Sequence, residues 1–457
     1  MLRLGQKIPL MIVDLADNGN GVGRYEDFVV FVPNTVPGDK LLVQLDRIKK
    51  NWAEGKPIEI VSPSPDRVRP HCIVADKCGG CQWQFASYSY QLQSKQNQVL
   101  QALVRLGKFP EDTIKAKIEN ILGAPQPFHY RNKVIYPIAQ NQEGKIKVGY
   151  YQPNTHKVIN LNQCPVQDQR LDPILLAVKQ DLNRSGWSVY NEANHQGNLR
   201  HLGFRIGRHS GEILITIVSQ SWELENIEQF AKNWLTLPGV VGVILNRNCQ
   251  PGNVIFGSES RCISGRDYIV EYFADLTLHL TADTFFQVYT EQAELLVELL
   301  SDLLDLQNTE TIVDAYCGVG TFTLPLARYS RKCYGIEIQE QAIRQAQKNA
   351  ILNKLTDRVE FTTGKVEKLL PSLATNPDIL ILDPPRKGCE SEVIEFIVQS
   401  KIDRVVYISC NPATLARDLQ LLCATDRYEI KTIQPIDFFP QTAHVETMVL
   451  LNRSNNE

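Results

Sequence analysis

One cysteine stands where an apolar strand passes directly into a helix. The segment RVVYISCNPATLARDL places Cys410 at the end of the strand, followed by Asn411 and Pro412, which are good N-cap and first-turn residues. Because helix-terminal amides and the helix dipole lower the pKa of a thiol, we expect thiolate at neutral pH. The position indicates a nucleophile. Four other cysteines are expected to be small buried hydrophobes: Cys317, Cys333, Cys389 and Cys423.

Glycines and a carboxylate follow two neighbouring strands. VDAYCGVGTF runs from a strand into Gly318 and Gly320, where missing side chains let a ligand approach the backbone. The G-x-G-x-x-G phosphate motif is not completed. Glu337 ends the next strand, where a carboxylate can accept hydrogen bonds from both hydroxyls of a ribose. These residues predict a nucleoside without a pyrophosphate, and S-adenosylmethionine fits.

A third strand, DILILD, ends in Asp383-Pro384-Pro385. The two prolines fix the backbone and remove two donors, so Asp383 is expected at the sheet edge facing the ligand. A rigid turn would explain the same residues. A carboxylate followed by two prolines at this edge is nevertheless typical of methyltransferases.

A nucleophilic cysteine beside a methyl donor suggests a particular chemistry. Carbon 5 of uracil attacks a sulfonium methyl only weakly, but addition of a thiolate to carbon 6 makes an enolate that can attack. A general base must then remove the proton on carbon 5. Glu446 in FPQTAHVETMVLL is the candidate, since apolar neighbours should raise its pKa. An exposed glutamate in a surface hairpin is the alternative. His444 is the one histidine near this chemistry.

Three cysteines lie within ten residues, at Cys72, Cys78 and Cys81, and Cys164 precedes a proline far downstream. Four thiolates suit tetrahedral zinc or a four-iron four-sulfur cluster, and ligand type alone leaves both open. The odd total of 11 cysteines without an export signal argues against a disulfide framework.

Two features point weakly to RNA. PFHYRNKVIY, residues 127–136, alternates aromatic rings with Arg131 and Lys133, a pattern that suits stacking on single-stranded RNA and equally a half-buried strand. Residues 285–457 carry 17 Lys and Arg against 24 Asp and Glu, whereas the preceding part has a slight basic excess. A nucleic-acid footprint would therefore lie in the first two thirds of the chain.

The spacing of apolar residues predicts three domains. Short alternating strands separated by turn residues indicate a small β-barrel over residues 1–61, followed by a proline-rich linker. A polar segment from Tyr88 has apolar residues at helical spacing and leads into strands and hairpins, which indicate an α+β domain over 71–280. Strand–helix repeats over 285–457 predict a Rossmann-like α/β domain that an antiparallel hairpin closes.

The composition is that of a folded protein, with 43% hydrophobic and 22% charged residues among 457. It excludes collagen-like and largely disordered chains. No uncharged apolar stretch approaches the roughly 18 residues of a membrane helix. We therefore expect a cytoplasmic protein without a membrane partner.

Taken together, Cys410, Glu446, the DPPR motif and the cysteine cluster resemble the RNA uracil-5 methyltransferase family, particularly its iron–sulfur 23S ribosomal RNA branch. The resemblance covers nearly the whole chain and implies a class I methyltransferase fold. NGNGVGR and VFVPNTVPGD in residues 1–61 look like its TRAM domain, an oligonucleotide-binding-type barrel. The resemblance also implies a central α+β domain with an iron–sulfur site.

The resemblance assigns roles to ten residues. It implies Cys410 as nucleophile, Glu446 as general base, and S-adenosylmethionine contacts at Gln287, Tyr316, Glu337 and Asp383; it implies 4Fe-4S ligands at Cys72, Cys78, Cys81 and Cys164. One departure is Tyr289, where the family usually has Asn after FFQV. Arg386 and Lys387 are expected near substrate phosphate.

The expected function is therefore methylation of carbon 5 of a specific uridine in 23S ribosomal RNA. One alternative is a transfer-RNA enzyme that modifies the T-loop uridine, because the chemistry is the same. An alternative of another class is a noncatalytic RNA-binding or assembly factor. The target nucleotide is left open, and a monomer is expected.

Overall fold

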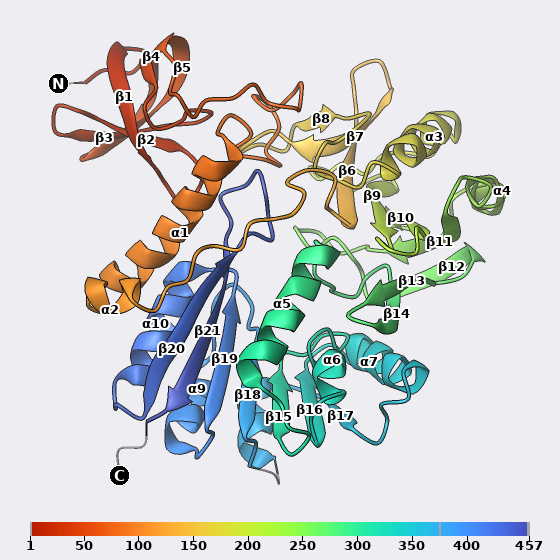
Figure 1. Cartoon of the computed structure of the whole chain (residues 1–457). Helices are drawn as coiled ribbons and strands as arrows, with labels where there is room; N and C mark the ends of the chain where they lie inside the picture. Colours follow the sequence, from red (N-terminus) through yellow and green to blue (C-terminus); the bar gives the residue numbers. More distant parts are fainter. Residues whose placement is uncertain (1, 374–375, 455–457) are drawn as a thin grey trace.

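The computed structural model describes residues 2–373 and 376–454. Its strands form a closed barrel, two seven-stranded sheets and one two-stranded sheet. Figure 1 shows the barrel and the C-terminal sheet joined by a long helix, with the central sheet beside them. Within the described ranges, no helix has the length and apolar character needed to cross a bilayer.

The N-terminal barrel has the strand order β1-β2-β3-β5-β4. Its strands are β1 (Lys7–Leu15), β2 (Gly21–Tyr25), β3 (Phe28–Val32), β4 (Lys40–Ile48) and β5 (Trp52–Ser62). Alternate residues of β1 point inward, as Ile8, Leu10 and Ile12 do, and fill the barrel. The barrel confirms the fold that the spacing of the turns predicts.

Helix α1 (Tyr88–Arg105) connects the barrel side of the molecule to the C-terminal sheet (Figure 1). Its last buried residues, Val99 and Leu103, join the apolar core under that sheet. Its first buried residues, Gln91 and Lys95, are polar and bind the segment before the final strand. A short helix, α2 (Glu111–Lys115), follows. Residues of this N-terminal half therefore cover part of the C-terminal sheet.

The central sheet has the order β12-β11-β10-β9-β6-β7-β8. Its elements are β6 (Lys133–Gln140), β7 (Ile146–Tyr151), β8 (Val158–Asn160), α3 (Leu171–Arg184), β9 (Leu199–Ile206), β10 (Ile213–Ser219), α4 (Ile227–Trp234), β11 (Val240–Arg247) and β12 (Glu259–Gly265). Tyr130 and Tyr136 beside and within β6 are 1% and 0% exposed. The hypothesis that residues 127–136 form an RNA-stacking surface is therefore wrong for these rings, because they fill the core.

The C-terminal sheet has the order β17-β16-β15-β18-β19-β21-β20. A hairpin of β13 (Tyr268–Phe273) and β14 (Leu276–Thr281) and helix α5 (Thr290–Leu304) precede it. Its strands are β15 (Thr311–Ala315), β16 (Lys332–Glu337), β17 (Val359–Thr363), β18 (Ile379–Leu382), β19 (Arg404–Ser409), β20 (Tyr428–Ile436) and β21 (Glu446–Arg453). The first five of these are parallel, and β20 and β21 form the predicted antiparallel pair.

Apolar cores cover both faces of this sheet, as continuous apolar strands require. The sheet's other helices are α6 (Thr323–Ala327), α7 (Glu340–Leu352), α8 (Val366–Leu369), α9 (Ser391–Gln399) and α10 (Pro412–Cys423), with a 3-10 turn, η1 (Leu370–Ser372). On one face, Ile312 and Ile379 pack in the core that contains α5, α6 and α7 residues. On the other, Val313 and Leu380 pack in the core of α9, α10 and α1.

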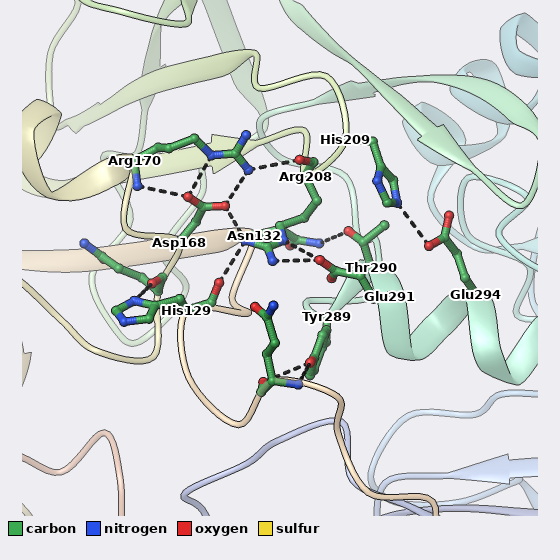
Figure 2. Close-up of polar contacts among 12 residues, drawn as sticks. His129, Asn132, Asp168, Arg170, Arg208, His209, Tyr289, Thr290, Glu291 and Glu294 are labelled. Carbon is green, nitrogen blue, oxygen red and sulfur yellow. Dashed lines mark hydrogen bonds and ion pairs between the residues drawn. The ribbon is translucent and has the colours of Figure 1, made fainter. Parts of the chain in front are cut away.

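A polar network joins the central sheet to the start of α5. Figure 2 shows Arg208 between Asp168 and Glu291, and its guanidinium lies 2.7 Å from the Glu291 carboxylate. Asn132 donates through Nδ2 to the carbonyl of Gln287 at 2.8 Å and to the hydroxyl of Thr290 at 2.9 Å. The network therefore fixes the loop that carries Gln287.

Candidate active site

The parallel strands bring four of the predicted site residues to one edge of the sheet. Strands β15, β16, β18 and β19 run in the same direction, so the residues at their carboxyl ends, Tyr316, Glu337, Asp383 and Cys410, lie at the same edge. Strand β21 is antiparallel to β19, and Thr447 pairs with Ser409. Glu446 therefore begins its strand at this edge, next to the position of Cys410.

The turn after β15 leaves space for a ligand at its glycine. Gly318 has a φ of +55°, and a Cβ added there would meet no atom within 4 Å. Its amide donates to Oε2 of Glu337 at 3.3 Å, while Oε1 of Glu337 accepts from the amide of Gln339 at 2.8 Å. The carboxylate is thus held with lone pairs available beside an open glycine turn, an arrangement that suits the hydroxyls of a ribose.

Buried carboxyl groups collect behind this turn. Desolvation raises the pKa of Asp314 to about 7, even though the hydroxyl of Thr323 donates to it. Desolvation also raises the pKa of Asp383 to about 7, with the charges of Asp314 and Glu337 adding to the effect. The Oδ1 atom of Asp314 has no hydrogen-bond partner among the described residues. A cationic ligand would stabilise the ionised form of these groups, so the edge suits a sulfonium compound.

Gln287 reaches the same edge from the loop before α5. Its Nε2 donates to Asp383 at 3.5 Å, and Asn132 holds its carbonyl, as described above. Asn132 is a positioning residue that sequence reasoning missed, because a single asparagine at the start of a strand carries no distinctive signal. The structure therefore brings Gln287, Tyr316, Glu337 and Asp383 together.

The departure at Tyr289 has a structural explanation. Its ring stacks on Tyr130 with ring centroids 4.7 Å apart, and its hydroxyl contacts the amide and the carbonyl of Gln126 at 3.0 Å and 2.9 Å. Figure 2 shows the Tyr289 side chain apart from the Asn132–Thr290 contact. Tyr289 therefore joins two segments of the chain.

Helix α10 holds the loop that follows β18. The Asn411 side chain accepts from the amide of Ala413 at 3.0 Å, as an N-cap should, and its Nδ2 donates to the carbonyl of Arg386 at 3.0 Å. The hydroxyl of Thr414 donates to the same carbonyl at 3.2 Å. Lys387, in contrast, is exposed and pairs with Glu390. Cys410 and the DPPR segment are thus held as one unit.

Cys410, Arg386 and His444 line a cleft of about 680 Å³. Its walls come from the turn after β1, from α1, from the start of α10 and from the loop before β21. Desolvation lowers the pKa of His444 to about 4, so the ring is neutral at physiological pH. The cleft is open to the surface and large enough for a nucleotide base with its neighbours.

The thiol of Cys410 is not acidified in the free protein. Desolvation and the charges of Glu446 and Asp383 raise its pKa to about 11, against the charge of Arg386 and a backbone hydrogen bond. The predicted lowering of this pKa is therefore wrong, because burial and two carboxylates raise it. Glu446 itself is 4% exposed, and desolvation followed by the charge of Asp383 raises its pKa well above the usual range.

The four predicted cluster ligands line one small pocket. Cys72, Cys78, Cys81 and Cys164 surround it together with Arg131. Burial raises the pKa of Cys81 to about 12 and that of Cys164 to about 11. No group of three or more His, Cys, Asp or Glu side chains in residues 2–373 and 376–454 is arranged to hold a metal ion. The geometry brings the thiols together without establishing metal binding.

Comparisons with known proteins agree with this geometry. The family model for tRNA (Uracil-5-)-methyltransferase matches residues 87–454, and the model for the TRAM domain matches residues 2–58. An uncharacterized RNA methyltransferase of Nostoc sp. is 52% identical over 448 residues, which cover 98% of this chain and 96% of that protein. Another from Clostridium tetani is 39% identical over 447 residues, covering 97% and 95%.

A solved structure is similar over nearly the whole chain. It is the Pyrococcus abyssi tRNA (uracil-54, C5)-methyltransferase in complex with S-adenosyl-L-homocysteine, with a TM-score of 0.78 and 27% identity, covering 97% of this chain and 99% of that one. The TRAM barrel and the methyltransferase fold confirm the predicted architecture. The chain belongs to the tRNA (uracil-5-)-methyltransferase family of S-adenosylmethionine-dependent RNA methyltransferases.

Proposed function

We propose that this chain methylates carbon 5 of one particular uridine in structured RNA, with Cys410 as nucleophile and Glu446 as general base. The observation that carries the proposal is the pairing of β19 with β21, which sets Cys410 beside Glu446 at the edge where Asp383 and Glu337 end their strands. The cleft at this edge admits a base that has been turned out of its stack.

Four residues would hold the methyl donor. Glu337 offers its carboxylate to the ribose, Gln287 reaches Asp383, and Tyr316 follows β15 at the same edge. Bound S-adenosylmethionine supplies an electrophilic methyl group. The desolvated carboxyl groups of Asp314 and Asp383 favour a positively charged donor over its neutral product.

The proposed reaction is balanced at carbon 5 and carbon 6 of the uracil. The Cys410 thiol gives up its proton to water, and the thiolate forms a bond to carbon 6. The electrons of the bond between carbon 5 and carbon 6 then move toward the carbonyl oxygen as an enolate. Carbon 5 then takes the methyl group, while the donor sulfur keeps the electrons of its former bond. Glu446 removes the proton from carbon 5, the bond from carbon 6 to sulfur breaks, and Cys410 leaves as thiolate.

Arg386 has a specific role in this proposal. Its charge lowers the pKa of both Cys410 and Glu446, against the effect of burial. It therefore favours the thiolate needed for addition and the carboxylate needed for proton removal. We therefore propose that Arg386 acts mainly on these two groups rather than on substrate phosphate. For Lys387 we still propose a contact with substrate phosphate.

Two observations bear on the RNA target. The cysteine-rich pocket is the feature that resembles the ribosomal branch, so we propose 23S ribosomal RNA as the substrate. The similar Pyrococcus abyssi structure is of an enzyme that acts on uracil 54 of tRNA, which favours the T-loop uridine as a second candidate.

We also propose that the pocket of Cys72, Cys78, Cys81 and Cys164 holds a 4Fe-4S cluster. A zinc ion needs all four sulfurs at about 2.3 Å from one centre. A cluster takes one thiolate on each iron, so its ligands lie farther apart. Four thiols that line one pocket offer the ligand type that either group needs, and the resemblance to the iron–sulfur branch of the family favours the cluster.

Iodoacetamide should modify Cys410 of the free enzyme faster as the pH rises. With a pKa of about 11 the thiolate fraction grows about tenfold per unit between about pH 7 and pH 9. Arg386→Gln should slow the reaction at every pH, and Arg386→Lys should restore most of it. Mass spectrometry of the Cys410 peptide measures the rate, with the exposed Cys249 as internal control. Equal rates at both ends of the range would contradict the raised pKa.

Glu446→Gln should stop the reaction after methyl transfer. We expect release of tritium from uracil-5-labelled RNA to fall by about 10²–10⁴-fold. The protein should remain joined to the RNA as a complex that survives denaturing electrophoresis. Cys410→Ala should give neither release nor complex, and Glu395→Gln, an exposed glutamate on α9, should behave as the wild type. Undiminished release from Cys410→Ala would exclude the nucleophile.

Mass mapping of RNA from a deletion strain tests the target. We expect one 5-methyluridine to disappear from 23S ribosomal RNA and to return when the gene is restored, but not when Cys410→Ala is supplied. Loss from the T-loop of tRNA would instead support the second candidate. An unchanged pattern in both RNAs would contradict the proposed activity.

Protein purified without oxygen should contain about four iron atoms and four sulfides per chain, with broad visible absorption. Cys164→Ser should lose the iron and the absorption, because a buried ligand is removed, whereas Cys249→Ser should keep both. Elemental analysis and absorption spectra measure the outcome. Stoichiometric zinc without iron would contradict the cluster.

A further inference from the structure

Helix α1 forms a long wall of the cleft that contains Cys410. Its residues on this wall are Tyr90, Gln93, Ser94, Asn97, Gln98, Gln101, Ala102 and Arg105. Gln93 and Asn97 are exposed, and Gln101 is half-buried. The wall is therefore accessible to whatever enters the cleft, and it is continuous with the proposed site of reaction.

The wall is an ordered row of amides. Gln93, Asn97 and Gln101 are four residues apart, so they lie one above the other on one face of the helix. Along eight residues this row spans about 12 Å, at 1.5 Å per residue. Stacked nucleotides along one strand of a duplex rise about 3.4 Å each, and unstacked nucleotides lie farther apart. The row is therefore long enough to face more than one nucleotide of an unstacked loop.

The composition of α1 differs from that of an ordinary solvated helix face. Exposed faces usually carry acidic and basic residues together. Helix α1 contains no Asp or Glu in its 18 residues, and its only charges are Lys95, which is buried, and Arg105 near the far end. A surface without carboxylates that offers amide donors and acceptors is suited to the edges of bases.

The opposite wall of the cleft points to bases rather than phosphates. Asp14 and Asp17 stand on the barrel side of the same cleft, where they would repel phosphates but can accept hydrogen bonds from base amino and imino groups.

We propose that the Gln93–Asn97–Gln101 row of α1 reads the bases of the RNA nucleotides that flank the target uridine. This inference rests on the proposed function, because it takes the uridine to be bound at Cys410. The row contacts unstacked bases of a single-stranded loop through their hydrogen-bonding edges, and Arg105 lies at its outer end. The three amides are specificity residues and take no part in bond making at carbon 5 or carbon 6.

The test is selection by binding from a library of RNA hairpins. Each hairpin has one fixed loop uridine and randomised neighbours, and the RNA retained by limiting protein is sequenced. We expect the wild type to enrich particular nucleotides beside the uridine. Asn97→Asp exchanges a donor for an acceptor at an exposed position and should shift the preferred nucleotide at one loop position by about tenfold.

Gln93→Ala/Gln101→Ala should reduce the enrichment at the neighbouring positions toward an even distribution. Gln399→Ala, which alters an exposed glutamine at the end of α9 outside the cleft, should match the wild type. Melting temperature and S-adenosylmethionine affinity of each variant, equal to the wild type, show that the fold and the donor site are intact. Unchanged enrichment in the α1 variants, or no enrichment by the wild type, would overturn the inference.

A second measurement separates this inference from the proposed function. The same hairpins with 5-fluorouridine at the fixed position test covalent attachment to Cys410. If enrichment depends on α1 but no covalent adduct forms, base recognition by α1 is supported and the nucleophilic role of Cys410 is refuted. An adduct that forms with equal yield whatever the neighbouring bases would refute the reading role and leave the chemistry standing.

Discussion

A buried ion pair joins helix α1 to the segment before β21, two walls of the cleft that contains Cys410. Lys95 of α1 and Asp437 after β20 are both 0% exposed, and Nζ lies 2.6 Å from Oδ1. Nζ also donates to the carbonyl of Phe439 at 3.0 Å, and the Tyr88 hydroxyl donates to the other carboxylate oxygen at 3.0 Å. Removing one partner of such a pair typically costs about 3–5 kcal/mol, because the other charge stays buried.

The ion pair matters for the cleft through the segment it holds. Residues 437–445 connect β20 to β21. They include His444 and lead directly to Glu446, the first residue of β21. The side chain of Gln91 on α1 donates from Nε2 to Oε1 of Gln441 at 3.1 Å, and its Oε1 accepts from the backbone amide of Gln441 at 3.0 Å. Helix α1 therefore fixes the segment before β21 with one face, while residues of another face line the cleft.

Much of the fold followed from the sequence, because periodicity and turn residues are local signals. Turn spacing predicted the barrel, and the run of strands and helices predicted the C-terminal sheet with its antiparallel closing pair. The topology of a parallel sheet also explains why Glu337, Asp383 and Cys410 were expected at one edge. The exact limits of the three predicted domains and the roles of these residues stay predictions.

What the sequence could not predict depended on burial and on distant partners. The helix start at Cys410 was recognisable, but its pKa is raised first by burial and then by the charge of Glu446, which lies more than thirty residues later in the chain. Lys95 reads as an ordinary surface lysine until Asp437 is placed beside it. The alternation of residues 127–136 likewise does not tell which rings are buried. Only the packing of the central sheet shows that Tyr130 and Tyr136 are core residues.

The position of β21 has a consequence for how this protein is made. It follows all other described strands in the chain, yet it lies inside the sheet, between β19 and β20. A nascent polypeptide that has emerged only as far as β20 therefore exposes two open strand edges, which are prone to aberrant pairing with other chains. It also lacks Glu446. The strand that completes the sheet and the proposed general base are therefore acquired in the same final step of synthesis.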